Sequence, residues 1–206
     1  MEGFENAIPV VEEPQVILPK TEETVEIEKD SIDLSKIRGL SDEEKKDVNR
    51  IKVDISDKKA PVIILFGPAS CGKTMTLVRL SRYLISQGYK LQPVRTFRPS
   101  DDKNYKELCD NFSTIVNSDE AASRTDNISF MLVQVIKNGR VICQILEGPG
   151  ELYFNPTKAH QEFPTYVHYL FNDAELRKIF VFFVEPNFMD PENRSNYVST
   201  LGQVQQ

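Results

Sequence analysis

Two kinds of apolar pattern alternate along the central part of the chain. Residues 62–66 and 179–184 are continuous apolar runs, which are typical of strands buried on both faces of a parallel sheet. Residues 72–87, and a second segment that follows Asp102, carry apolar side chains at helical spacing. Gly88 is a stop signal for the first of these helices. This alternation predicts an α/β fold with a mostly parallel sheet.

The middle of the chain predicts one exception to the parallel arrangement. Residues 128–136 and 141–147 are rich in β-formers, and Asn138-Gly139 lies between them. This dipeptide between two such segments is a strong signal for a β-hairpin. We therefore expect one antiparallel hairpin (128–136/141–147) within the sheet, and a further strand at residues 91–97.

Three further helices are expected. Ser41 and Glu44 form a capping-box pattern, which predicts a charged helix that ends near residue 51. Pro164 is suited to the first position of a helix over residues 165–171. A last helix is expected over residues 193–206.

Charge is distributed unevenly along the chain. Residues 1–33 hold ten acidic side chains and two lysines, a net charge of −8, so the formal total of −6 leaves +2 for the remainder. We interpret residues 1–33 as a disordered acidic tail that is able to contact a protein partner, residues 34–60 as a short helix and linker, and residues 61–206 as the folded domain. A nearly neutral domain has no basic surface broad enough for general nucleic-acid binding.

Cysteine and histidine are too sparse to build a disulfide framework or a zinc site. The chain holds three cysteines and two histidines, without a C-x-x-C pair. Its first residues lack the basic and apolar regions of a signal peptide. The longest apolar runs are far below the roughly 20 residues that span a bilayer. A cytoplasmic protein is the expectation.

A glycine-rich loop joins the first apolar run to the first helix. It matches G-x-x-x-x-G-K-[ST], and the strand before it and the helix after it are the context that this pattern requires. Its backbone N–H groups can curve around a phosphate, and the helix N-terminus adds positive potential. The pattern predicts a site for the phosphates of a nucleoside triphosphate, either GTP or ATP. The expected nucleotide-binding residues are Gly67, Pro68, Ala69, Ser70, Cys71, Gly72, Lys73 and Thr74.

The last two residues of the loop carry most of the expected chemistry. Lys73 is the catalytic candidate because its ammonium group would neutralise oxygens of the β- and γ-phosphates. The hydroxyl of Thr74 would bind Mg²⁺, which is the expected cofactor. Cys71 lies in the same loop, two residues before Lys73. The helix N-terminus could lower the pKa of its thiol. A small residue tolerated in the loop is the simpler interpretation of Cys71.

A second segment, residues 147–151, follows the hairpin directly. Its sequence Glu-Gly-Pro-Gly-Glu begins with a carboxylate at the end of a strand, where an acid can complete the Mg²⁺ shell. This segment resembles the D-x-x-G segment of Ras-like GTPases, and the hairpin before it is in the order found in that family. Over roughly residues 61–185 the chain is similar to the GTPase-like class of P-loop NTPases, which includes translation-factor-related and divergent bacterial members.

The resemblance implies a fold and a set of residue roles. The fold would be the three-layer P-loop NTPase fold, and the activity a molecular switch that hydrolyses its nucleotide slowly. Glu147 would lie on the metal side, and the backbone N–H of Gly150 would contact the γ-phosphate. Glu151 would orient the attacking water as a catalytic residue. Thr125, which precedes the hairpin, would bind the metal as the switch I threonine does.

The chain departs from the family pattern at three points. Glu147 replaces the usual aspartate and reaches one methylene further. Residues 88–124 insert a strand and a helix where compact GTPases have a short loop. The base-reading motif [NT]-K-x-D is missing from the sequence, so guanine specificity is not supported.

Two other functions remain open from the sequence. A phosphotransferase of the nucleotide-kinase type could share the loop, and it would need a lid with arginines, for which Arg95, Arg98 and Arg124 are candidates. A non-catalytic module would retain bound nucleotide as a structural or assembly signal. Phosphate release that depends on an acceptor would favour the kinase, and tight retention without turnover would favour the module.

Overall fold

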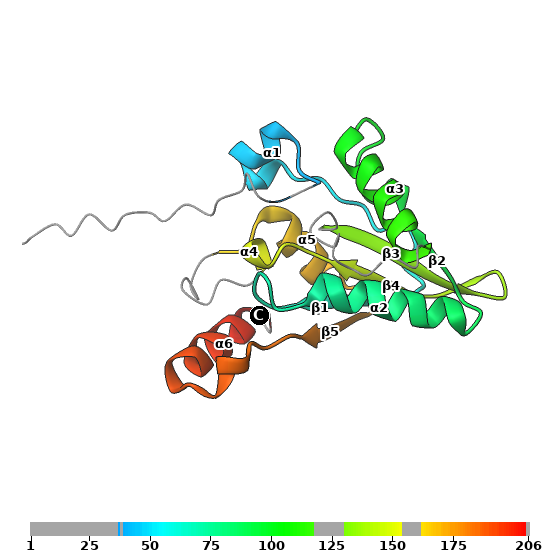
Figure 1. Cartoon of the computed structure of the whole chain (residues 1–206). Helices are drawn as coiled ribbons and strands as arrows, with labels where there is room; N and C mark the ends of the chain where they lie inside the picture. The colour runs from blue at the N-terminus through cyan, green and yellow to red at the C-terminus, as the bar shows by residue number, and fades with distance from the viewer. Residues whose placement is uncertain (1–36, 38, 118–129, 154–161, 205–206) are drawn as a thin grey trace, which may run out of the picture. The chain divides into compact units, whose positions relative to one another are not determined.

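A five-stranded sheet lies at the centre of the computed structural model, which describes residues 37, 39–117, 130–153 and 162–204 (Figure 1). All of these residues fall in one compact unit. The strands are β1 (Val62–Phe66), β2 (Lys90–Pro93), β3 (Met131–Lys137), β4 (Arg140–Glu147) and β5 (Lys178–Phe182). The α-helices are α1 (Asp42–Lys46), α2 (Lys73–Ser86), α3 (Lys103–Asn117), α4 (Gly150–Tyr153), α5 (Thr165–Asn172) and α6 (Pro191–Val204), and the 3-10 helices are η2 (Val48–Arg50), η3 (Arg95–Phe97) and η6 (Pro186–Met189).

The strand order is β2-β3-β4-β1-β5. β4, β1 and β5 pair in parallel, whereas β3 pairs antiparallel with both β2 and β4. The α/β class is therefore confirmed, but the sheet is more mixed than predicted, because one antiparallel pair was expected and two are present. The reason is that β3 alone runs against the other four strands and lies between two of them.

The hairpin of β3 and β4 forms where the Asn-Gly dipeptide predicts it. Asn138 and Gly139 have φ angles of 51° and 75°, and a two-residue hairpin turn of this kind requires positive φ at both positions. The pairing runs from Lys137↔Arg140 to Met131↔Glu147. The hairpin is confirmed, with β4 ending at the acidic residue that the sequence singles out.

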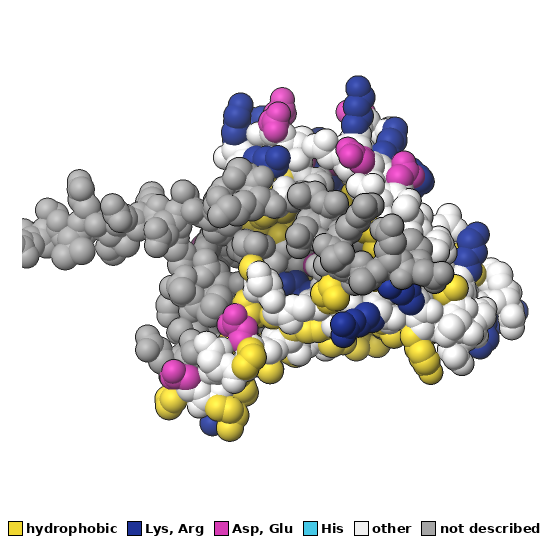
Figure 2. Space-filling model, viewed as in Figure 1, with side chains coloured by type: hydrophobic (Ala, Val, Ile, Leu, Met, Phe, Trp, Pro, Cys, Tyr) yellow, Lys and Arg dark blue, Asp and Glu magenta, His cyan; other side chains and the backbone are white. Residues whose placement is uncertain are grey.

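The two continuous apolar runs differ in burial. β1 has a neighbour on each side and is almost wholly buried, whereas β5 has only β1 beside it in the described sheet. Ile179 is 51% exposed and Phe182 is 45% exposed. The prediction of a strand buried on both faces was therefore wrong for residues 179–184, because an edge position leaves these side chains partly uncovered. Figure 2 shows hydrophobic side chains along the lower side of the molecule, over α2 and α6.

The helices that flank the sheet begin and end near the predicted positions. Asp102 caps α3, since its Oδ1 accepts a hydrogen bond from the N–H of Tyr105 at 2.9 Å. In α2, Leu77 and Val78 are buried as expected. Leu80 and Ile85, which also belong to the apolar pattern of this helix, are partly exposed, because the buried stripe is centred on Leu77 and Val78.

Helices follow both Ser41 and Pro164, as the sequence predicts. The capping box at Ser41 and Glu44 is present, but α1 ends at Lys46 and a 3-10 turn follows, so the expected helix is divided in two. Pro164 directly precedes α5, and its carbonyl accepts the N–H of Val167 at 2.9 Å. Among the described residues, no helix is both long and apolar enough to cross a membrane.

Candidate functional site

The loop between β1 and α2 has a backbone shape that depends on glycine. A Cβ added to Gly67 would lie 2.7 Å from the carbonyl oxygen of Phe183, so a larger residue cannot be accommodated without movement. Gly72 has a φ of 92° and Ser70 a φ of 61°, both in the left-handed region. Left-handed residues within a loop turn successive N–H groups toward a common centre, which suits an anion.

The loop leads directly into the N-terminus of α2. Gly72 is the N-cap residue and provides no side-chain cap, and the first turn of α2 holds no acidic side chain. The first N–H groups of an α-helix lack intrahelical acceptors and carry partial positive charge. This end of α2 therefore has the electrostatic character of an anion-binding site.

Lys73 lies at the first position of α2 and folds back over the loop. Its ammonium donates hydrogen bonds to the carbonyl oxygens of Gly67 at 3.0 Å and Pro68 at 2.7 Å, and lies 3.8 Å from the sulfur of Cys71. A thiol sulfur is a poor acceptor. The contact with Cys71 is therefore the one that an oxygen of a bound phosphate would replace most easily.

Thr74 and Glu147 meet although 73 residues separate them in the sequence. The hydroxyl of Thr74 donates a hydrogen bond to Oε1 of Glu147 at 2.9 Å. The sheet causes this meeting, because β4 pairs in parallel with β1 and places Glu147 opposite Leu65, near the start of the loop. The structure thus brings together the two predicted metal ligands that it describes.

This pair is chemically suited to Mg²⁺. A hydroxyl and a carboxylate supply the hard oxygen ligands that Mg²⁺ takes from proteins, and phosphate oxygens and water usually complete its octahedral shell. Within residues 37, 39–117, 130–153 and 162–204, no group of three or more His, Cys, Asp or Glu side chains is placed to hold a metal. The residues present fit a metal shared with a phosphate ligand rather than a cage made by protein alone.

Gly150 lies against the glycine-rich loop. A Cβ added to Gly150 would overlap the backbone nitrogen of Ala69 and would lie 2.7 Å from the carbonyl oxygen of Pro68. Only glycine permits this approach of two backbones. The segment after β4 and the loop after β1 are therefore in direct backbone contact.

The remaining predicted site residues are less fully described. Thr125 and Arg124 belong to residues 118–129, which lie outside the described part of the chain. Glu151 is in α4, directly after Gly150, and its side chain also lies outside the description. The expected roles of Thr125 and Glu151 stay predictions.

The two described arginines proposed for a kinase lid are engaged elsewhere. Arg98 is buried and bonded to Glu44 and Asp102. Arg95 is exposed and pairs with Asp110. These ion pairs direct both guanidinium groups toward carboxylates of the protein itself.

Phe130 is a site residue that the sequence did not reveal. Its backbone N–H donates a hydrogen bond to Oε2 of Glu147 at 3.1 Å, and its φ is 58°. An aromatic residue at the start of a β-rich segment is ordinary in sequence, since an aromatic ring favours strands. The sequence therefore contains no signal for this contact.

Cys71 does not have the activated thiol that its position at a helix N-terminus suggested. Burial raises the pKa of Cys71, and the nearby Lys73 opposes this effect only in part. Because the thiolate is the reactive form, a raised pKa makes the thiol less reactive at neutral pH. The structure therefore gives no support to a lowered thiol pKa at this cysteine.

Alkylation of the half-buried cysteines is expected to report on ligand binding. Burial also raises the pKa of Cys143, so both thiols should react with iodoacetamide slowly at pH 7.5 and faster as the pH rises. Adding Mg²⁺ and nucleoside triphosphate should slow the labelling of Cys71 by about tenfold, while Cys143 in β4 serves as the internal control. Peptide mass spectrometry measures both rates, and equal protection of both cysteines would contradict a ligand at the loop.

No protein family model, no curated protein and no solved structure matches this chain.

Proposed function

We propose that this chain binds a nucleoside triphosphate together with Mg²⁺ and hydrolyses it slowly, as a molecular switch of the GTPase-like kind. The observation that carries the proposal is the 2.9 Å hydrogen bond between Thr74 and Glu147. These residues come from two separate motifs, and each motif independently predicts a metal ligand. Their meeting beside a glycine-rich helix N-terminus supports a single site for metal and phosphate.

Each described residue has a distinct part in this proposal. The backbone of residues 67–74 surrounds the phosphates, and the ammonium of Lys73 balances their negative charge. Thr74 and Glu147 hold Mg²⁺, which neutralises the charge that develops on the phosphate oxygens during transfer. Gly150, in contact with the loop, offers its backbone N–H to the terminal phosphate.

The arrangement of the sheet is compatible with a P-loop NTPase fold, which is part of the proposal. The loop follows the interior strand β1, and the acidic residue ends the neighbouring parallel strand β4. In open α/β sheets, ligands bind outside the carboxyl ends of the strands. The site lies at this end for β1 and β4.

Hydrolysis in this proposal proceeds by in-line attack of water on the terminal phosphorus, which breaks its bond to the bridging oxygen and releases nucleoside diphosphate and inorganic phosphate. Glu151 orients the water, and Thr125 approaches the metal, so both segments respond to the presence of the terminal phosphate. The intrinsic rate should be slow, because an arginine supplied by a partner accelerates comparable reactions by about 10³–10⁵.

The kinase alternative has less support from the described residues. Such an enzyme needs arginines that are available to phosphate, whereas Arg98 is held by two buried carboxylates and Arg95 pairs with Asp110. The second alternative, a non-catalytic binding module, would use the same site. It differs from the proposed function only in that the bound nucleotide is not hydrolysed.

Calorimetry and phosphate release together test the proposed function. The protein is titrated with ATP and with GTP, in Mg²⁺ and in EDTA, and phosphate release is then measured without an acceptor. Binding of at least one triphosphate that is stronger in Mg²⁺, with slow phosphate release, is the expected result. Absence of binding to both triphosphates in Mg²⁺ would overturn the proposal, and binding without any release would favour the module.

A further inference from the structure

Phe130 has a backbone conformation that phenylalanine rarely adopts. Its φ of 58° lies in the left-handed region, where a bulky side chain is strained, and its side chain is completely buried. Strained residues persist only where their surroundings hold them, and they gather at functional sites. The strain in Phe130 therefore points to a structural demand at this position.

This backbone conformation allows the N–H of Phe130 to reach the carboxylate of Glu147. The backbone N–H of Phe130 donates to Oε2 at 3.1 Å, while the hydroxyl of Thr74 donates to Oε1 at 2.9 Å. The two hydrogen bonds use different oxygens of the same carboxylate. Together they fix both the position and the plane of the group.

A glutamate needs this second attachment more than an aspartate would. Its side chain has one more rotatable bond, so its carboxylate has more conformations to lose when it becomes ordered. Carboxylates that bind metals are usually oriented by hydrogen bonds from groups outside the metal shell. The N–H of Phe130 is such a group for Glu147.

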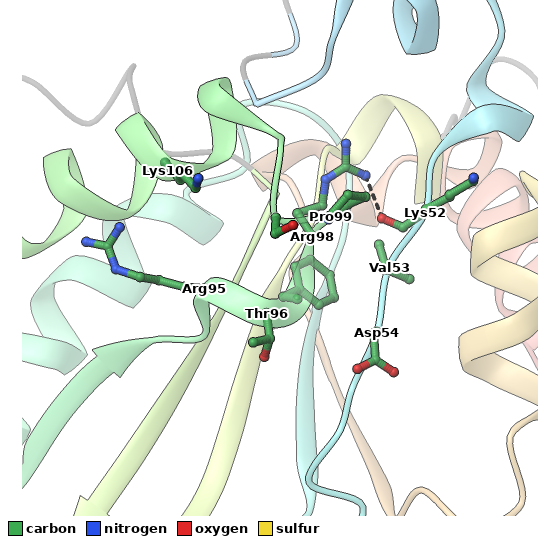
Figure 3. A pocket seen from close by; sticks show the side chains of 10 residues that line it. Lys52, Val53, Asp54, Arg95, Thr96, Arg98, Pro99 and Lys106 are labelled. Atoms are coloured by element: carbon green, nitrogen blue, oxygen red, sulfur yellow. Dashed lines mark hydrogen bonds between the residues drawn. The ribbon is translucent and has the colours of Figure 1, made fainter.

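The ring of Phe130 explains how the strained backbone is kept in place. Its centroid lies 5.5 Å from that of Phe97 and 5.3 Å from that of Tyr166, in edge-to-face contacts. The guanidinium carbon of Arg98 lies 5.3 Å from the same centroid. Figure 3 shows that Arg98 is itself anchored by a hydrogen bond to the carbonyl oxygen of Lys52, at 2.9 Å.

We propose that Phe130 is a positioning residue for Glu147, with its buried ring locking a strained backbone N–H onto Oε2 so that Oε1 faces Thr74 and the metal. This role rests on the proposed function, because it requires that the carboxylate of Glu147 binds Mg²⁺. It adds a residue that contacts neither phosphate nor metal and still determines how strongly the metal binds.

The affinity for Mg²⁺ at saturating nucleotide tests this role. Phe130→Ala should weaken Mg²⁺ binding by about 10- to 100-fold, the usual cost of losing an orienting group behind a metal ligand. Phe112→Ala is the matched control, since Phe112 is a similarly buried phenylalanine in α3. It should change the Mg²⁺ affinity less than twofold, and Phe130→Leu should recover most of the loss. Equal effects of both alanine variants would overturn the proposal.

A double-mutant cycle separates positioning from general loosening of the fold. In a Glu147→Gln background the metal-binding charge is gone, so Phe130→Ala should weaken the remaining Mg²⁺ binding less than threefold. The same large loss in both backgrounds would show that Phe130 acts without Glu147, which would overturn the proposal.

The amide resonance of Phe130 tests the hydrogen bond without any nucleotide. Glu147→Gln replaces a charged acceptor by a neutral one and should shift the Phe130 amide proton upfield and speed its exchange with solvent. An unchanged amide would overturn the proposal even if Phe130→Ala failed to fold. If the amide responds but the unaltered chain shows no Mg²⁺-dependent nucleotide binding, the proposed function fails, and the metal-positioning role fails with it.

Discussion

Replacing Lys73 by alanine is expected to lower the affinity for nucleoside triphosphate by about two to four powers of ten. A hydrogen bond to a charged group contributes about 1.5–3 kcal/mol, and a lysine in such a loop contacts both the β- and the γ-phosphate. Two contacts therefore correspond to about 3–6 kcal/mol, which is a factor of about 10² to 10⁴ in the dissociation constant. Calorimetric titration in Mg²⁺ measures the loss.

The same substitution should leave the fold intact but less stable. The ammonium of Lys73 now binds the carbonyl oxygens of Gly67 and Pro68, and an unsatisfied buried polar group costs about 1–3 kcal/mol. Lys90→Ala is the control, because Lys90 is an exposed lysine in β2, and its removal should change the affinity less than twofold. Unchanged nucleotide affinity in the Lys73 variant would count against the site.

Local sequence signals predicted the elements of this fold well where one dipeptide or one cap decides the structure. Asn138-Gly139 determines the β3–β4 turn through its positive φ angles, and Asp102 begins α3 through a bond to a backbone N–H. Each of these signals acts within a few residues. Such interactions do not depend on the rest of the molecule, so the sequence alone is sufficient to predict them.

The position of a strand in the sheet is a different kind of property. The apolar runs of β1 and β5 look alike in sequence, yet β1 has a strand on each side and β5 lies at the edge of the described sheet. Likewise, β2 joins the far edge beside β3, which creates the second antiparallel pair. Strand order depends on long-range pairing, and hydrophobic periodicity does not encode it.

In the candidate site too, some features were predictable from local sequence and others depend on long-range contacts. The two motifs separately predicted Thr74 and Glu147 as ligands of the same Mg²⁺, and the parallel pairing of β1 and β4 brings them into contact. The contribution of Phe130 depends on a backbone angle and on an aromatic cluster assembled from distant segments. Contacts of that kind become visible only in three dimensions.

Replacing Arg98 by alanine is expected to destabilise the fold by about 3–5 kcal/mol, the usual cost of breaking a buried ion pair. The side chain of Arg98 is 1% exposed, and those of Glu44 and Asp102 are 9% and 8% exposed. Without Arg98, two buried carboxylates would lose their cationic partner. Urea unfolding measures the change, and Arg95→Ala, which breaks an exposed pair with Asp110, should leave the unfolding midpoint nearly unchanged.

A second substitution distinguishes the loss of charge pairing from the loss of packing. In the Arg98→Ala background, Glu44→Gln removes one of the uncompensated charges and should therefore recover about 1 kcal/mol or more. The recovery should be incomplete, because Glu44 also closes the capping box of α1 by accepting the N–H of Ser41 at 2.9 Å. If Glu44→Gln instead lowers the free energy of unfolding further, by as much as it does in the unaltered protein, the guanidinium stabilises the fold by filling space. The ion pair then contributes little. Arg98 also contacts the ring of Phe130, the residue that orients Glu147. Recovery of stability by Glu44→Gln would therefore also mean that the ion pairs of Arg98 with Glu44 and Asp102 support Phe130.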